Sequence, residues 1–293
     1  MHFKFHSLLL ISALFCTLTS GIATTCWGSP SPSTEVVVLV PGFFNSLAPG
    51  GTMLIQKHPY FSDDIVSVFE QRKYKVYVVD NLDPVGSIVN NTNLLKTYLK
   101  YIETREPHKT MLLVGHSAGG LYSLQASSAD PSLPIRQIST LGTPFSGLRF
   151  LENLEKSRLP TDIILKFMNL SSLVEFTTQN MKGVISALRL NPELKIDINY
   201  GYQLSTKMTF PMRLANRIGA GASDGIVTLE SATDIDFLKS AGSQNVSVQR
   251  DDYIHLEHWQ QVLSYRMFSI FNIDLDAIRA EQIRYYNKIA DNF

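Results

Sequence analysis

The chain has 293 residues, in which 26 lysines and arginines balance 26 aspartates and glutamates. With 44% hydrophobic and 18% charged residues, it has the composition of one large globular domain, with or without an inserted cap. The balance of charge leaves no global basic field for nucleic acid, the composition excludes a disordered chain, and no internal repeat suggests a repeat array. The only cysteines are Cys16 and Cys26, and no CxxC or HExxH motif is present, which argues against a dedicated zinc site.

The first 23 residues have the pattern of an export signal. Lys4 precedes an apolar run from Leu8 to about Leu18, and small residues follow up to Ala23. This run is shorter than the ~20 apolar residues that a membrane-spanning helix needs. We therefore expect residues 1–23 to be a signal peptide and the protein to be secreted or periplasmic. A lipid anchor on Cys26 is a minor alternative.

Along residues 34–293, apolar runs typical of strands alternate with segments in which apolar residues recur at helical spacing. The first run, VVVLV, is continuous, which indicates a strand buried on both faces. Ser62 is suited to cap a helix, and apolar residues recur at helical spacing over Leu94–Ile102 and again through Leu121 and Leu124. The predicted strands are Val36–Val40, Lys75–Asp80, Thr110–Val114, Gln137–Leu141, Leu194–Tyr200 and Val246–Arg250. This alternation predicts an α/β fold with a mostly parallel central sheet flanked by helices.

The third predicted strand runs directly into the pentapeptide Gly115-His116-Ser117-Ala118-Gly119, and a helix follows. A strand, a GxSxG turn and a helix in this order form the nucleophile elbow of a serine hydrolase. The residues two before and two after the serine must be small in so tight a turn, and Gly115 and Gly119 meet this need. Ser117 is therefore the candidate nucleophile.

A serine nucleophile needs a base and an acid, and hydrolases of this kind place them after the serine in the order acid, histidine. Only His255 and His258 follow Ser117, and both lie just beyond the last predicted strand. Asp224, in a glycine-rich loop, is the preferred acid. The competing carboxylates are Asp197, Asp234, Asp236 and Asp251.

Five blocks resemble the bacterial secreted triacylglycerol lipases, the true lipases of the α/β-hydrolase superfamily. The blocks are VVVLVPGFFNS, LLVGHSAGG, STLGTPFSGL, SDGIVTLESA and IHLEHWQQ, within residues 36–147 and 222–262. The resemblance implies an α/β-hydrolase fold with Ser117 as nucleophile, Asp224 as acid and His255 as base. His255 is preferred because a leucine follows it, as in the family, and His258 remains the alternative.

The same resemblance implies an oxyanion hole made of the backbone amides of Phe43 and Ala118. The family has His-Gly where this chain has Pro41-Gly42, which bears on the geometry of the loop and on acyl preference. No cofactor is expected for catalysis. Family members often carry a structural calcium ion near the catalytic histidine, and Glu257 and Gln261 occupy two of its ligand positions.

Residues 148–190 lie between the fourth predicted strand and the loop of Asp224. They contain apolar residues at helical spacing from Leu159 to Phe176. Hydrolases of this superfamily commonly place a lid here, so we expect a helical cap or lid, with buried core as the alternative.

The expected function is therefore that of a secreted lipase that hydrolyses acylglycerols through an acyl-enzyme on Ser117. Its partners would be a lipid or ester substrate and a transient lipid–water interface, with no nucleic acid. An esterase, a phospholipase or an acyltransferase with the same triad is the alternative among enzymes. A non-catalytic lipid-binding or surface-binding hydrolase fold is the alternative outside them. The sequence does not indicate an oligomeric state.

Overall fold

The structure, a computed structural model, describes residues 34–43, 60–156, 171–219, 221–249, 252–271 and 273–293. Ser33–Phe293 forms one compact unit. The expected signal peptide and Cys26 lie outside the described residues. Among the described helices, none has the length and apolar character needed to cross a bilayer.

A parallel sheet of six strands forms the centre of this unit. The strand order is β2-β1-β3-β4-β5-β6, and every neighbouring pair is parallel. The strands are β1 (Glu35–Val40), β2 (Lys75–Val78), β3 (Thr110–His116), β4 (Ile135–Leu141), β5 (Lys195–Asn199) and β6 (Asn245–Val248). All six predicted strands are confirmed, with shifts of a few residues at their ends.

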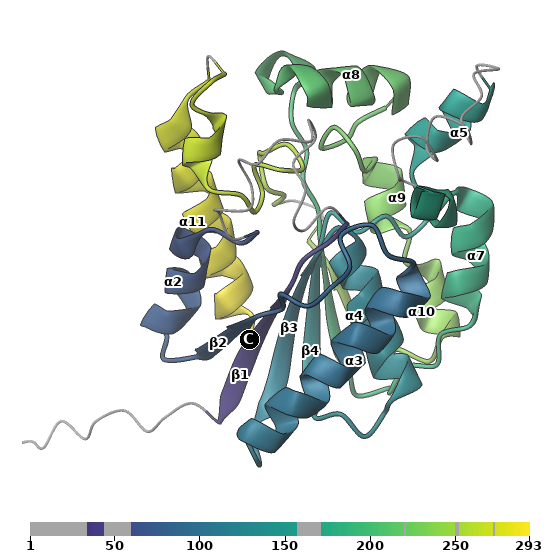
Figure 1. Cartoon of the computed structure of the whole chain (residues 1–293), viewed down its shortest axis with the longest axis vertical. Helices are drawn as coiled ribbons and strands as arrows, with labels where there is room; N and C mark the ends of the chain where they lie inside the picture. Colours follow the sequence, from purple (N-terminus) through teal and green to yellow (C-terminus); the bar gives the residue numbers. More distant parts are fainter. Residues whose placement is uncertain (1–33, 44–59, 157–170, 220, 250–251, 272) are drawn as a thin grey trace, which may run out of the picture. The chain divides into compact units, whose positions relative to one another are not determined.

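Helices cover both faces of the sheet. The longer ones are α2 (Asp63–Gln71), α3 (Ile88–Arg105), α4 (Ala118–Ala129), α5 (Arg149–Lys156), α7 (Thr178–Ser186), α8 (Phe210–Gly219) and α11 (Leu275–Asp291). Shorter elements are α9 (Leu229–Thr233), α10 (Asp236–Ser240), η2 (Ser171–Phe176), η3 (Ser205–Lys207) and η4 (Tyr265–Phe268). In Figure 1, α3 and α4 lie in front of the sheet, while α2 and α11 lie together on its other side. The predicted α/β architecture is confirmed.

The continuous apolar run of β1 follows from this layering. Val36, Val38 and Val40 belong to a core that also contains side chains of α3 and α4. Val37 and Leu39 point the other way, into a second core with side chains of α2 and α11. Because successive side chains of a strand alternate between faces, a strand covered on both sides must be apolar at every position.

Helix caps explain where α2 and α3, the first helices in the described residues, begin. The Ser62 hydroxyl accepts a hydrogen bond from the Ile65 amide at 3.4 Å, so the predicted cap of α2 is confirmed. The Ser87 hydroxyl accepts from Asn90 N at 3.0 Å and starts α3 six residues before the stripe that predicted this helix. Such hydroxyls satisfy amides that have no partner inside the helix.

The segment expected to form a lid is described by the structure only in part. It contains α5, η2 and α7. Residues 157–170, which carry most of the apolar pattern from Leu159 to Phe176, lie outside the described residues. Within η2, Leu173 and Phe176 are buried in the core on the α3 and α4 side. The Phe176 ring contacts the Phe43 ring edge-on, with centroids 5.9 Å apart. At these two positions the apolar pattern corresponds to core.

Candidate active site

Ser117 occupies the sharp turn between β3 and α4. Its backbone has φ 55° and ψ −129°, a strained conformation for a residue with a side chain. Ser117 N donates to Leu141 O at 2.8 Å, and Ser117 O accepts from Thr143 Oγ1 at 2.9 Å. These bonds hold the turn, so the predicted strand, elbow and helix are confirmed around a partly exposed serine.

The elbow leaves no room for larger residues at its glycines. A Cβ atom on Gly119 would lie 2.2 Å from Val40 O, and one on Gly115 would lie 2.6 Å from Gly120 N. Contacts this short are incompatible with an added methyl group. The requirement for small residues at both positions is therefore physical.

The loop after β1 lies directly against the serine. A Cβ atom on Gly42 would lie 2.7 Å from Ser117 Cβ and 3.2 Å from Ala118 N. Ala118 is the first residue of α4, where the amides have no acceptor inside the helix. Phe43, the next residue of the loop, is buried. The two segments that carry the expected oxyanion donors thus meet beside Ser117, although this loop has Pro41 where the family has histidine.

Asp224 is a fully hydrogen-bonded carboxylate that is 1% exposed. Its Oδ1 accepts from the amides of Ile226 (3.1 Å) and Val227 (2.8 Å). Its Oδ2 accepts from Gln261 Nε2 at 2.9 Å and lies 2.7 Å from His258 Nδ1. A second bond joins the same two segments, from His258 N to Asp224 O at 2.8 Å. The predicted acid therefore has a histidine partner, and that partner is His258.

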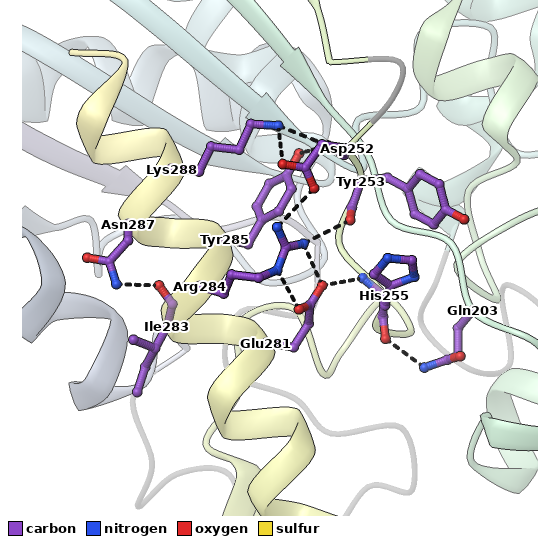
Figure 2. Close-up of polar contacts among 10 residues, drawn as sticks. All are labelled: Gln203, Asp252, Tyr253, His255, Glu281, Ile283, Arg284, Tyr285, Asn287 and Lys288. Atoms are coloured by element: carbon purple, nitrogen blue, oxygen red, sulfur yellow. Dashed lines mark hydrogen bonds and ion pairs between the residues drawn. The ribbon is translucent and has the colours of Figure 1, made fainter.

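The expected pairing of His255 with Asp224 is wrong. Figure 2 shows His255 beside α11, where its amide donates to Glu281 Oε1 at 2.8 Å and its carbonyl accepts from Gln203 Nε2 at 2.7 Å. The residue before it, Ile254, pairs with Gly201 in an isolated parallel bridge. His255 is exposed, and its ring lies against that of Tyr253. The chain reaches Asp224 only three residues later, after a turn.

The competing carboxylates have other surroundings. Asp197 is buried within β5, where it accepts from Gln137 Nε2 at 2.5 Å and from the hydroxyl of Ser247. Asp234 is exposed and accepts from Ser146 Oγ at 2.8 Å. Asp236 is exposed in α10, and Asp251 lies outside the described residues.

His116, next to the serine, continues the site behind His258. It is buried, and its ring centroid lies 4.5 Å from that of His258. Burial and the neighbouring His258 hold the pKa of His116 well below its usual value, so its ring is neutral. Its Nδ1 lies 2.7 Å from Tyr60 Oη. Burial raises the pKa of that phenol, which therefore stays protonated and can donate to the ring.

Glu257 and Gln261 do not fit the calcium site that the resemblance implied. The two Glu257 oxygens accept from Thr209 N at 2.6 Å and Thr209 Oγ1 at 2.9 Å. Gln261 directs its amide nitrogen to Asp224. Calcium requires several converging oxygens. Within the described part of the chain, no group of three histidines, cysteines, aspartates or glutamates could hold a metal ion.

Sequence reasoning missed the roles of Tyr60, His116 and Gln261 around the acid and the histidine. Gln261 was noted only as a calcium ligand, and nothing in the pattern around Tyr60 pointed to the site. His116 could have been noticed as the polar residue inside the GxSxG turn. These contacts arise between segments far apart in the chain.

No protein-family model matches the chain, and a sequence comparison with curated proteins finds no match. Solved structures share its fold. A metagenomic carboxyl esterase is similar at 16% identity and TM-score 0.66, over 89% of this chain and 75% of the esterase. The Staphylococcus hyicus lipase is similar at 14% identity and TM-score 0.63, over 90% and 96% of the two chains. Lipase 1 from Pelosinus fermentans gives 13% identity and TM-score 0.58, over 88% and 98%. With its parallel sheet and flanking helices, the chain has the α/β-hydrolase fold of these lipases and esterases.

Proposed function

We propose that the chain is a serine carboxylic-ester hydrolase in which Ser117 is the nucleophile, His258 the base and Asp224 the acid. One observation carries the proposal: a buried Asp224–His258 pair, 2.7 Å apart, whose histidine ring packs on the residue before a strained elbow serine. A buried carboxylate that hydrogen-bonds to a histidine is the arrangement that activates a serine hydroxyl.

The geometry supports a two-step reaction. Asp224 Oδ2 accepts the Nδ1 proton of His258, which leaves Nε2 free to take the proton of Ser117 Oγ as the oxygen attacks the ester carbonyl. The amides of Phe43 and Ala118 would donate to the developing oxyanion. His258 returns its proton to the leaving alcohol, and the acyl group stays on Ser117. Water deprotonated by His258 then releases the carboxylic acid and restores the serine.

Acylglycerols are the substrate class that we propose within this chemistry. Support comes from the resemblance of five sequence blocks to lipases and from similar folds among solved structures that include the S. hyicus lipase. A phospholipase, a plain esterase and an acyltransferase would use the same residues.

We also propose that the protein is exported, either secreted or periplasmic, on the basis of the apolar segment in residues 1–23. Edman sequencing of the exported product should begin near Thr24. A product that retains Met1 and stays in the cytoplasm would contradict this proposal.

The test of the chemistry compares matched variants in the hydrolysis of dissolved p-nitrophenyl butyrate. We expect Ser117→Ala and His258→Ala each to reduce kcat by roughly 10⁴-fold or more, and the double variant to be hardly slower than either, because triad members act as a unit. His255→Ala is the matched control and should keep nearly full activity. Loss of activity in His255→Ala with full activity in His258→Ala would reverse the assignment.

Emulsified triglycerides, phospholipids and an alcohol acceptor would then separate the substrate classes. Hydrolysis of triglycerides supports the lipase, whereas transfer to the alcohol in excess of hydrolysis would replace it with an acyltransferase. A correctly folded protein without activity on any ester would contradict the proposal that the chain is an enzyme.

A further inference from the structure

Exposed apolar side chains gather around the start of α8. Leu204, Phe210 and Leu214 are 52%, 70% and 50% exposed. They make up half of the large hydrophobic residues that are exposed in the described part of the chain, and the others are Val89, Tyr101 and Ile270. Single exposed apolar residues are ordinary, but three within eleven positions form an exposed apolar patch, which is typical of a binding surface.

The outward face of α8 combines these residues with positive charge. Phe210, Leu214 and Arg217 recur at the i, i+4, i+7 spacing that places side chains on one face of a helix, and Arg213 lies between them. All of these side chains are exposed. The opposite face is held by Met212, which is 5% exposed and lies against Gly225 in the loop of Asp224. Figure 1 shows α8 at the top of the view, beyond the carboxyl ends of the strands.

The charge of this region differs from that of the chain. Lys207, Arg213 and Arg217 are its cations, and no aspartate or glutamate occurs between Asp197 and Asp224, although the whole chain has a formal net charge of +0. The single bond from Arg213 to Met208 O leaves the rest of its guanidinium without a carboxylate partner among the described residues. A helix face with apolar and basic side chains attracts a surface that is both apolar and anionic.

We propose that the face formed by Leu204, Lys207, Phe210, Arg213, Leu214 and Arg217, the basic apolar face, docks on an anionic phospholipid surface. The apolar side chains would enter the headgroup region while the cations pair with lipid phosphates. The helix would lie on the bilayer, since α8 has only 10 residues. This placement sets the loop of Asp224 close to the lipid. The docking proposal rests on the proposed ester hydrolysis only in explaining what docking is for. Docking itself can be measured without catalysis.

The experiment uses the full chain carrying Ser117→Ala, so that the lipid stays intact, and measures co-sedimentation with vesicles. Every variant shares the same amino-terminal segment, so the contribution of that segment cancels. We expect tighter binding to phosphatidylglycerol than to phosphatidylcholine. Arg217→Gln should weaken binding to phosphatidylglycerol about fivefold and leave binding to phosphatidylcholine unchanged. Phe210→Ser should weaken binding to both, by roughly tenfold.

Matched controls are Lys182→Gln, an exposed cation on α7, and Ile270→Ser, an exposed apolar residue outside the face. Neither should change binding. Equal effects of controls and test variants, or no preference for phosphatidylglycerol, would overturn the proposal. A lowered melting temperature in Phe210→Ser with unchanged vesicle binding would also overturn it, because another part of the chain would then cover the face. Hydrolysis of p-nitrophenyl butyrate, measured separately with Ser117 intact, reports on the proposed enzyme alone.

Discussion

Replacing Glu257 by glutamine should stabilise the protein at alkaline pH. Glu257 is 0% exposed, and both of its oxygens bond to Thr209. Burial raises the pKa of this carboxyl from 4.5 to about 7, and the bonds from Thr209 only partly oppose the shift. The folded protein therefore binds this proton more tightly than the unfolded chain does. The resulting stability is fully present below pH 4.5 and is lost as the pH rises through about 7.

The size of the effect follows from the two pKa values. The difference between 4.5 and about 7 corresponds to a loss of about 3 kcal/mol in the free energy of unfolding between acid and alkaline pH. Glutamine has the shape of the protonated carboxyl and can still accept from Thr209 N and donate to Thr209 Oγ1. We expect Glu257→Gln to leave the stability unchanged near pH 4 and to raise it by about 3 kcal/mol at pH 8.5.

Urea unfolding followed by far-ultraviolet circular dichroism at the two pH values measures this difference. Glu106→Gln is a control with the opposite sign, because hydrogen bonds from Lys75 and Tyr77 lower the pKa of Glu106 to about 2. Its stabilising contribution is present above pH 4.5 and is lost as the pH falls, so Glu106→Gln should destabilise the protein at pH 8.5. If Glu257→Gln shifts stability equally at both pH values, or destabilises the protein at pH 8.5, the argument from burial fails.

Three further substitutions test the site and its surroundings. Gly42→Ala places a methyl group 2.7 Å from Ser117 Cβ, which should displace the oxyanion loop and lower kcat for p-nitrophenyl butyrate by about 10²–10³-fold; an unchanged kcat would show that the loop adjusts at no cost. Gln261→Met removes a hydrogen bond to Asp224 Oδ2, so kcat should fall roughly tenfold at constant KM. A change in KM alone would show that Gln261 does not position the acid. Phe176→Ala should lower the free energy of unfolding in urea by about 3–5 kcal/mol, because the ring is buried in the core. A loss near zero would instead favour a mobile lid at this position.

The sheet and the elbow could be predicted because their signals are local. VVVLV is apolar at each position since β1 is covered on both faces, and Gly115 and Gly119 are small because the turn around Ser117 admits nothing larger. Each of these constraints acts within a few residues of the pattern that reveals it. The same holds for the Ser62 cap.

The choice between His255 and His258 could not be made this way. The two residues share one short segment, and the following leucine favoured His255, whereas His258 is the one that contacts Asp224. The decision depends on the pairing of Ile254 with Gly201, which carries the backbone of His255 past the acid, and on the turn that brings His258 back to Asp224. Both contacts join segments more than thirty residues apart.

The bonding of Glu257 was equally hidden. A carboxylate two residues after the expected base was interpreted as a metal ligand, and its burial against Thr209 depends on how the segment before α8 packs. Helices α8 and α11 were not predicted either. The stripe of α8 is short and mixes cations with its apolar residues, so its pattern differs from that of a core-facing helix.

In the proposed mechanism, Ser117 is a nucleophile activated by His258. Labelling with a fluorophosphonate probe, followed by mass spectrometry of the modified peptide, can detect this activation, because the probe reacts with an activated serine. We predict that the label is found on Ser117 in the unmodified protein and in His255→Ala, and that it is lost in His258→Ala. A folded protein that does not react, or that carries the label on a different serine, would contradict the account.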